Sequence, residues 1–348
     1  MKAVIIQTAF LGDAILTTPM FAAFKRFFKD SKLTAVLRPD GAQLLQGLPA
    51  LDEIIAYDKK KKHRGISGIR KLATELRERE FDVLLSPHDS HRTSFVAMFS
   101  KIPERYGFKD AGFARLAYNR RLERHGGLPE IKRLLHFLDD SIAPGAAEFS
   151  TQLSLVEDKA SIQEAEALLR KHEALRPILL APSSVWPTKR WTPYGFAELA
   201  AKLVRRYKTK ILLVGAPGDR EICDSVQSFL KELQPHFVQE KVETVAGDTS
   251  LRGFYSLVKR SRLLISNDSA PVHYACAAGI PLVAVFGPTT QSLGYAPITK
   301  NSRIAELDLA CRPCGTHGGL VCPLGHFRCM KELTADSIME QVQALIDQ

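Results

Sequence analysis

The sequence predicts an α/β protein made of two doubly wound domains with a cleft between them. Short apolar runs, typical of parallel strands buried on both faces, alternate with helix-like stretches along almost the whole chain. The alternation restarts after a Pro/Gly/Ala-rich stretch at Ala143–Ala147, and 348 residues are enough for two domains. Ligands of such sheets bind beyond the carboxyl ends of the strands, so we expect functional residues in the turns that follow them.

Nine apolar runs are expected to be strands. The first series is Ala3–Ile6, Leu33–Leu37, Glu53–Ala56 and Val83–Leu85. The second series is Ile178–Ala181, Ile211–Val214, Val242–Val245, Leu263–Ile265 and Leu282–Phe286. A polar helix near Asp158–His172 separates them, and a last helix near Ala335–Ile346 is expected to pack back on the body. The expected domains are therefore 1–157 and 158–332, followed by the helix at 333–348.

The charge balance indicates an anionic partner. The chain has 48 Lys and Arg against 38 Asp and Glu, a net charge of +10 with a pI near 9.3. Nucleic acid, an acidic membrane surface and a phosphorylated substrate all fit this charge. The cations are scattered without a recognition helix, an aromatic platform or a nucleic-acid motif, which argues against nucleic acid. The composition, 45% hydrophobic and 25% charged, excludes a disordered tail, a disulfide-stapled module and a collagen-like rod.

The expected location is the cytoplasm. No apolar run approaches the ~20 residues that span a bilayer. The N-terminus imitates a signal peptide faintly, but Gln7, Gly12 and Asp13 interrupt its apolar stretch. Cys223 and Cys276 each lie singly in an apolar helix, which fits a reducing compartment.

Asp13 is the first candidate for chemistry. It follows Gly12 in the turn after the first strand, at the start of the next helix. As an N-cap, its carboxylate would accept hydrogen bonds from helix amides. As a base, it would face the cleft and deprotonate an acceptor hydroxyl. The spacing alone does not separate these interpretations.

The second domain opens with a turn that carries hydroxyls and two cations, Lys189 and Arg190. Such a turn at a strand end suits a phosphate or pyrophosphate. It would equally fit a solvated basic loop with Trp191 filling the core beneath it. The next glycine-rich turn is neither GxGxxG nor a P-loop. Its Asp219 and Glu221 would favour a helix N-terminus through the dipole or accept hydrogen bonds from sugar hydroxyls.

The densest polar turn follows the strand at Leu263–Ile265. Asp268 or Ser269 is expected to cap a helix that has Pro271 in its first turn, so that backbone amides form an anion site. Asp268 is suited to vicinal hydroxyls. His273, about one turn into the helix, is either a packing residue or a neighbour of the anion.

Together these motifs resemble the ADP-heptose:lipopolysaccharide heptosyltransferases, especially the heptosyltransferase II type. The resemblance runs over essentially the full length and rests on Gly12-Asp13 with Pro19, Thr188–Trp191, Asn267–Ala270 with His273, and Phe286–Thr289. Ala270 stands where the family pattern has glycine.

The resemblance implies the GT-B architecture, with two Rossmann-like domains that bind the acceptor and the nucleotide-sugar. It implies inverting transfer of heptose from ADP-L-glycero-D-manno-heptose without a metal or other cofactor. Asp13 would be the general base, and Lys189 would stabilise the departing diphosphate. The donor-binding residues would be Ser183, Thr188, Arg190, Asp219, Glu221, Gly247, Asp268, Ser269, Ala270 and His273.

The implied acceptor is a phosphorylated, Kdo-bearing lipid A at the anionic inner-membrane surface, with which the protein would associate peripherally. The cationic run Lys59–Arg64 is either solvated surface or a contact with this acceptor, because each cation near such a membrane contributes about 1 kcal/mol. The acceptor-binding candidates are Arg92, Lys60, Lys61, Arg64 and Arg120.

Four cysteines cluster near the C-terminus: Cys311, Cys314, Cys322 and Cys329. Four thiolates can form a tetrahedral structural zinc site, but a second CxxC or CxxH pair is missing. Reduced thiols are the preferred expectation over zinc or a disulfide. The alternatives for the whole chain are a GT-B transferase with another nucleotide-sugar and a non-catalytic protein that binds an anionic ligand.

Overall fold

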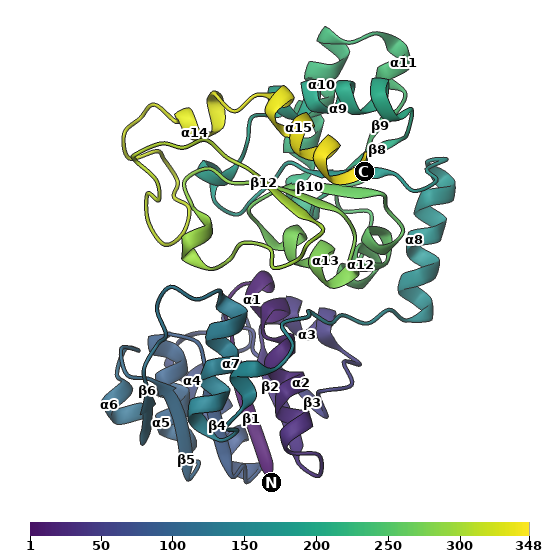
Figure 1. Cartoon of the computed structure of the whole chain (residues 1–348). Coiled ribbons are helices and arrows are strands. Elements are labelled where there is room, and N and C mark those ends of the chain that lie inside the picture. The colour runs from purple at the N-terminus through teal and green to yellow at the C-terminus, as the bar shows by residue number, and fades with distance from the viewer. Residues whose placement is uncertain (348) are drawn as a thin grey trace. The chain divides into compact units, whose positions relative to one another are not determined.

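A computed structural model of the chain describes residues 1–347. The chain forms two compact units, Met1–Val156 and Glu157–Gln348. Each unit is an α/β structure around a six-stranded sheet in which all neighbouring strands are parallel (Figure 1). The predicted α/β class is confirmed in both units.

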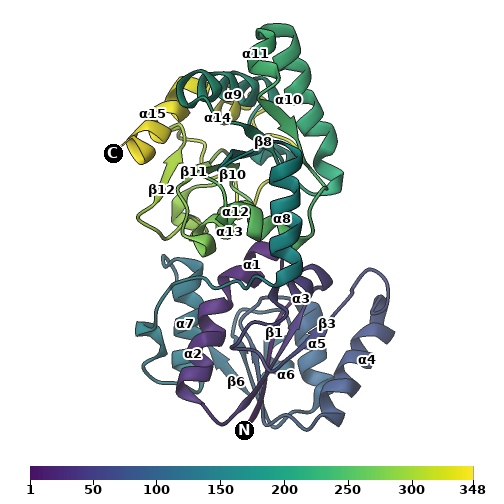
Figure 2. The same ribbon diagram turned by 90° about the vertical axis from the view of Figure 1, so that its right-hand side faces the viewer.

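The first unit has the strand order β3-β2-β1-β4-β5-β6. Its strands are β1 (Lys2–Gln7), β2 (Lys32–Leu37), β3 (Glu53–Ala56), β4 (Val83–Ser86), β5 (Glu104–Phe108) and β6 (Arg120–Leu122). Its helices are α1 (Leu11–Leu16), α2 (Thr18–Phe27), α3 (Pro39–Leu45), α4 (Gly65–Glu78), α5 (His91–Ser100), α6 (Ala114–Ala117), α7 (Glu130–Ser141) and the 3₁₀ turn η1 (Ala146–Glu148). Helix α2 packs beside α7, and α4 packs beside α5 (Figure 2).

The second unit repeats this winding, with the order β12-β11-β10-β7-β8-β9. Its strands are β7 (Ile178–Ala181), β8 (Ile211–Leu213), β9 (Val242–Thr244), β10 (Leu263–Asn267), β11 (Leu282–Val285) and β12 (Ser302–Ala305). Its helices are α8 (Lys159–Lys171), α9 (Pro193–Tyr207), α10 (Arg220–Leu233), α11 (His236–Gln239), α12 (Leu251–Lys259), α13 (Ala270–Ala278), α14 (Arg328–Lys331) and α15 (Ala335–Ile346). The 3₁₀ turns are η2 (Pro187–Lys189), η3 (Pro217–Asp219) and η4 (Gln291–Leu293).

The winding places one switch point in each sheet. In the first unit the chain adds β2 and β3 on one side of β1 and then returns to add β4 on the other side. In the second unit the same reversal occurs between β7 and β10. The crevice at such a reversal, outside the carboxyl ends of the strands, is the usual ligand position in this fold class. Ligand-binding and catalytic residues are therefore expected in the turns after β1, β4, β7 and β10.

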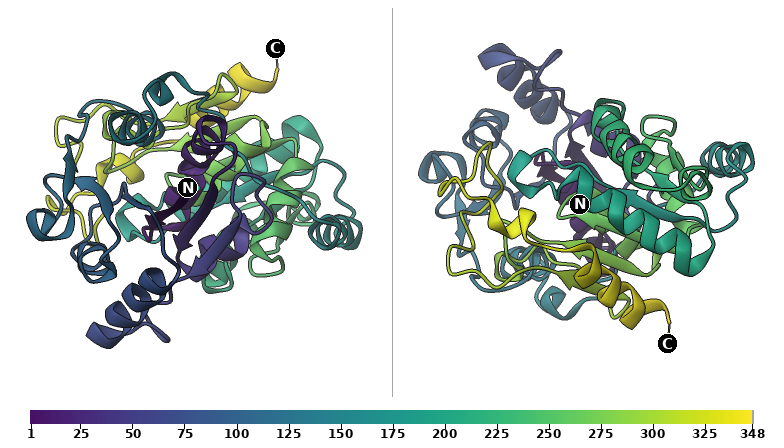
Figure 3. Two further views of the ribbon diagram at one scale, coloured as in Figure 1. Left: turned by 90° about the horizontal axis from the view of Figure 1, so that it is seen from below. Right: turned by 90° about the horizontal axis from the view of Figure 1, so that it is seen from above.

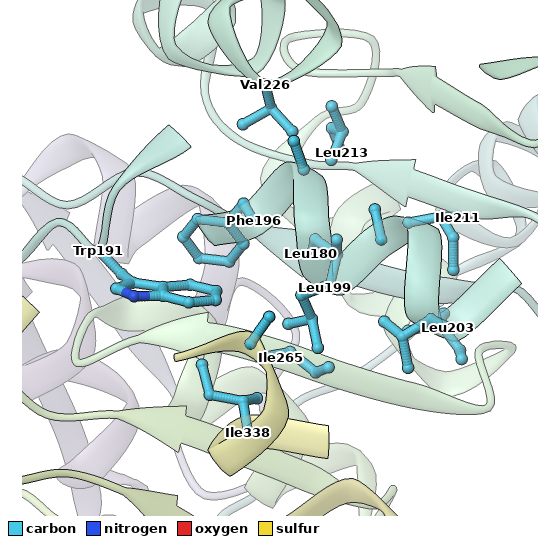
Figure 4. Close-up of a cluster of buried hydrophobic side chains, with 14 of the residues drawn as sticks. Leu180, Trp191, Phe196, Leu199, Leu203, Ile211, Leu213, Val226, Ile265 and Ile338 are labelled. Atoms are coloured by element: carbon cyan, nitrogen blue, oxygen red, sulfur yellow. The ribbon is translucent and has the colours of Figure 1, made fainter. Parts of the chain in front are cut away.

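The helices and strands of the second unit share one apolar core. Strands β7, β8, β10 and β11 are buried along their whole length, and α9 places Phe196, Leu199 and Leu203 on the face that meets them (Figure 4). Trp191 lies in the same cluster, and its indole N–H donates to the carbonyl of Leu333 at 3.0 Å. Helix α15 adds Ile338 to this cluster, so the last helix belongs to the core of the second unit.

The prediction of nine strands was incomplete, because β5, β6 and β12 were missed. Strands β6 and β12 are sheet edges. An edge strand pairs on one side only and tolerates polar residues, as Arg120 and Arg121 in β6 illustrate. Strand β5 begins with two half-buried charged residues, which breaks the apolar pattern. None of the helices within residues 1–347 combines the length and the apolar character that a membrane crossing requires.

Candidate functional site

Asp13 lies just beyond the carboxyl end of β1, in the third position of α1. The N-cap residue is Phe10, so the expectation that Asp13 itself would be the N-cap was wrong. Its carboxylate instead accepts the backbone N–H of Phe10 at 3.0 Å. Burial and the negative charge of Glu130 raise the pKa of Asp13 to about 6. A carboxylate with this pKa is ionised at neutral pH yet holds a proton well, as a general base requires.

Glu130 is a neighbour of Asp13 that the sequence did not reveal. It begins α7, its side chain is buried, and the guanidinium of Arg133 lies 2.9 Å from its carboxylate. A second arginine, Arg124, lies 3.5 Å from it. The effects of Glu130 and Arg124 on the pKa of Asp13 have opposite signs, so these two residues tune the carboxyl group.

The acceptor candidates of the first unit do not form one group. Lys60, Lys61 and Arg64 are exposed in the loop between β3 and α4. Arg92 donates from Nε to the hydroxyl of Tyr57 at 2.7 Å and from Nη2 to the carbonyls of His63 and Gly65. Its guanidinium therefore ties this loop to α5.

Arg120 and Lys59 both lie outside the group of exposed cations in this loop. Arg120 begins the edge strand β6 beside Glu104 and lies apart from the loop that carries Lys60 and Lys61. Lys59 donates to the carbonyl of Thr8, in the turn that leads to Asp13, at 2.8 Å. Burial and the charges of nearby arginines lower the pKa of Lys59 to about 8. Lys59, the first residue of the cationic run, is thus a fixed cation near the Asp13 turn.

The centre of the second unit is an ion pair between Lys189 and Asp268. The ammonium nitrogen lies 2.5 Å from Oδ2 of Asp268, and the two side chains are 13% and 8% exposed. Thr289, beyond the end of β11, donates its hydroxyl to the same oxygen at 2.7 Å. The Lys189 turn is therefore not a solvated loop, although Trp191 does fill the core beneath it as that interpretation assumed.

Asn267 fixes the Lys189 turn to the end of β10. Its side-chain oxygen accepts the backbone N–H of Trp191 at 3.0 Å, and its side-chain nitrogen donates to the carbonyl of Pro182 at 2.8 Å. One buried amide thus holds both ends of the turn between β7 and α9 and keeps Lys189 at the switch point.

Helix α13 begins next to this pair. As expected, Ser269 is its N-cap residue and Pro271 lies in its first turn, but the Ser269 side chain makes no capping hydrogen bond. The hydroxyl of Ser269 donates instead to the carbonyl of Asn267 at 3.3 Å. The backbone N–H groups that open a helix, here beginning at Ala270, favour an anion. His273 lies within the helix, and burial lowers its pKa to about 4, so it is a neutral imidazole at pH 7.

The remaining donor candidates brace the turns after β7 and β8. Ser183 donates to Asp219 at 2.6 Å, and Asp219 also accepts the backbone N–H of Ala216 at 2.8 Å. Arg190 donates to the carbonyl of Ser184 at 2.7 Å. Glu221 is exposed in the first turn of α10.

Gly247, beyond β9, has a backbone that only glycine adopts easily. Its φ is +83°, and a Cβ atom there would lie 2.9 Å from the Cα of Pro217. Its N–H donates to the carbonyl of Gly215 at 2.9 Å, which joins the β8 and β9 turns. The close approach of two backbones explains the glycine.

Gly247→Ala is expected to lower the stability of the protein by about 1–2 kcal/mol through the left-handed backbone alone, with a further cost from the contact with Pro217. Urea denaturation measures this change. Gly218→Ala is the matched control, since a Cβ atom there would meet nothing within 4 Å. Equal stability of the two variants would contradict the steric explanation.

The model of glycosyltransferase family 9 (heptosyltransferase) matches residues 69–320, well over half of the chain. The chain belongs to glycosyltransferase family 9. It is therefore a glycosyltransferase, and the resemblance to the heptosyltransferases inferred from the motifs is confirmed.

Relatives of this family 9 member align along nearly the whole chain. Lipooligosaccharide heptosyltransferase 2 of Campylobacter jejuni is 25% identical and covers 99% of both chains. Lipopolysaccharide heptosyltransferase 2 of Escherichia coli K12 is 23% identical with the same coverage. Among solved structures, a family 9 glycosyltransferase of Veillonella parvula has a TM-score of 0.86 at 23% identity, covering 99% of this chain and 96% of that one.

The E. coli ADP-heptose LPS heptosyltransferase II has a TM-score of 0.78 at 22% identity, covering 99% of this chain and 98% of that one. These likenesses identify the fold as the GT-B architecture.

The C-terminal segment of the family 9 chain braces the Lys189 turn. Gly319 exchanges hydrogen bonds with Thr188, and a Cβ atom at Gly318 would lie 2.9 Å from Cγ of Lys189. The buried guanidinium of Arg312 donates to the carbonyl of Thr289 at 2.8 Å and pairs with Glu306 at 2.6 Å.

This segment also carries the four clustered cysteines. All four are free thiols; Cys314 is exposed and Cys329 is buried. Over residues 1–347 no three His, Cys, Asp or Glu side chains are arranged to hold a metal ion. The visible role of the segment is to pack against the turn that bears Lys189.

Proposed function

We propose that this glycosyltransferase moves heptose from ADP-L-glycero-D-manno-heptose to the inner core of lipopolysaccharide with inversion at the anomeric carbon. The observation that carries the proposal is the placement of Lys189 beside the uncapped N-terminus of α13. A cation and free helix amides at a switch point suit the diphosphate of a nucleotide-sugar. The names of the full-length relatives, heptosyltransferase 2, support the choice of sugar.

On the donor side, the reaction breaks the bond between the anomeric carbon and the diphosphate oxygen. Negative charge then develops on the departing ADP. Lys189 and the first amides of α13 would stabilise this charge, which is the kind of contribution expected to dominate such a step. Because these groups supply positive charge, the proposed step requires no metal ion. Asp268 would hold hydroxyls of the sugar, and Asp219 or Glu221 would hold the ribose.

On the acceptor side, Asp13 would accept the proton of the attacking hydroxyl as the new glycosidic bond forms. A single displacement of this kind inverts the anomeric configuration. The proposed acceptor is a phosphorylated, Kdo-bearing lipid A, whose anionic groups would meet Lys60, Lys61 and Arg64. We place the enzyme at the cytoplasmic face of the inner membrane, where this lipid is exposed.

Calorimetric titration with ADP and UDP, each with and without EDTA, tests the donor assignment. We expect saturable ADP binding that is tighter than UDP binding and that EDTA does not change. Transfer of heptose from ADP-heptose would then be measured as an increase in the mass of the acceptor. Preference for UDP would make the protein a GT-B transferase with another nucleotide-sugar. Binding of neither nucleotide would leave a non-catalytic protein that binds an anionic ligand.

The pKa of Asp13 gives a pH dependence. The base must be ionised, so kcat/KM is expected to rise with pH through a midpoint near 6, the raised pKa of Asp13. Glu130→Gln removes a negative charge that raises this pKa, so the acid limb should move to lower pH. Glu148→Gln, at an exposed position of the same unit, is the control and should leave the limb in place. An acid limb unmoved by Glu130→Gln would show that Asp13 does not set it.

A further inference from the structure

Cations are scattered over the whole chain, but the surplus of cations over acidic residues in the first unit comes from one segment. Residues 1–156 have 25 Lys and Arg against 18 Asp and Glu, a net charge of +7 out of the total +10. Residues 59–79 alone have nine Lys and Arg against two Asp and Glu, which is also a net charge of +7. The rest of the first unit is therefore balanced, and its surplus lies in the loop after β3 and in α4. We call residues 59–79 the basic segment.

Most cations of the basic segment face solvent without a partner. Within residues 1–347, Arg79 is the one member found in ion pairs, with Glu53 and Glu75. The exposed cations are Lys60, Lys61, Lys62, Arg64, Arg70, Lys71 and Arg77. Ile66, in the first turn of α4, is 68% exposed among them. Helix α4 lies at the periphery of the first unit (Figure 3), so this charge is presented outward.

An apolar surface adjoins this charge on α5 and α6. We call Phe95, Phe99, Phe113 and Leu116 the apolar patch. Phe113 and Leu116 are 50% and 66% exposed. The ring of Phe95 lies 4.7 Å from that of Phe113 and 6.3 Å from that of Phe99, measured between centroids. The rings thus form a continuous apolar surface, which soluble monomers seldom expose without a binding role.

Direct contacts join the basic segment to the apolar patch. Arg92 donates to the carbonyl of Gly65 at 3.2 Å, which attaches the start of α5 to the start of α4. The preceding residue, His91, has its ring 5.6 Å from that of Phe113. Helices α4 and α5 also pack along their lengths (Figure 2). Cations and apolar side chains therefore adjoin on neighbouring elements of one unit.

We propose that the basic segment and the apolar patch dock the first unit onto an anionic lipid bilayer. The cations would pair with lipid phosphates, and Phe113, Leu116 and Ile66 would enter the boundary of the acyl chains. The combination favours this partner over nucleic acid, which would leave the apolar patch unused. The choice of a membrane rests in part on the proposed function, but lipid binding can be measured without catalysis.

Sedimentation with vesicles of phosphatidylglycerol and phosphatidylethanolamine tests the proposal, with phosphatidylcholine vesicles as the neutral comparison. The full-length protein should bind the anionic vesicles and bind the neutral ones weakly. Arg70→Gln/Lys71→Gln should weaken binding roughly thirtyfold, because it removes two cations at about 1 kcal/mol each. Phe113→Ser/Leu116→Ser should weaken it by roughly the same factor by removing apolar contact.

The matched control is Leu175→Ser/Phe237→Ser, two exposed apolar side chains of the second unit, which should bind like the unaltered protein. ADP affinity should be unchanged in all variants, so loss of vesicle binding with normal ADP binding separates this proposal from the proposed function. Absence of binding to anionic vesicles would overturn it. So would a dimer in light scattering that Phe113→Ser/Leu116→Ser converts to a monomer, because a second copy would then cover the patch.

Discussion

Asp13→Asn is expected to lower kcat by about 10²–10⁴-fold, the usual contribution of a general base. The asparagine side chain keeps the shape and can still accept the N–H of Phe10, but it cannot take the proton of an acceptor hydroxyl. Affinity for ADP should be unchanged, because the nucleotide is assigned to the second unit. Single-turnover transfer and ADP calorimetry measure the two quantities. Normal turnover with weakened ADP binding would overturn the assignment of the base.

The same variant provides its own folding control. The pKa of Asp13 in the folded protein, about 6, lies above its ordinary value of 3.8. The folded state therefore binds this proton more tightly than the unfolded chain does, so the ionised carboxylate lowers stability increasingly as pH rises from 3.8 to 6. Asparagine removes that cost, so Tm at pH 7.5 should be equal or higher. Asp110→Asn, at an exposed position, should change neither turnover nor Tm.

Lys189→Ala is expected to weaken both ADP binding and turnover, with kcat lower by about 10²–10³-fold. The ammonium group acts on the diphosphate in the ground state and more strongly as charge develops on it, so both quantities depend on it. Lys189→Arg should restore only part of the loss, because a planar guanidinium does not reproduce a compact ammonium. A rate that Lys189→Ala leaves unaffected would remove this lysine from the site.

A structural effect of Lys189→Ala must be separated from the chemical one. The substitution leaves the buried carboxylate of Asp268 with the hydroxyl of Thr289 as a partner but without a cation, and an unpaired buried charge is destabilising. The double variant Lys189→Ala/Asp268→Asn removes both charges, so it should regain stability but not rate. Lys202→Ala, which breaks an exposed ion pair with Asp336 in the same unit, is the matched control and should be active.

The fold was predictable because its signal is local. Central strands such as β1 and β10 are buried on both faces, and burial selects continuous apolar runs that a sequence displays directly. The edge strands β6 and β12 lack that constraint and were missed. The turns that carry Asp13 and Lys189 were also found, since their position after a strand follows from the same pattern.

The surroundings of these residues were not predictable, because they come from remote parts of the chain. Glu130 raises the pKa of Asp13 from its place in α7, and Arg312 donates to the carbonyl of Thr289 from the cysteine segment. Neither lies in a motif that distinguishes it from a surface charge. The partners of Arg92 show the same limit, since the sequence did not reveal that this arginine holds the loop before α4.

The ion pair between Lys189 and Asp268 has a consequence for how a donor would enter. Binding of a diphosphate at Lys189 would be an exchange of partners, because the incoming phosphate replaces a carboxylate that already neutralises the ammonium. The released Asp268 then needs new hydrogen-bond donors, and the hydroxyls of an attached sugar can provide them. A nucleotide without its sugar leaves that need unmet. The ion pair would therefore favour binding of the nucleotide-sugar over binding of ADP, and so favour release of ADP after the sugar has been transferred.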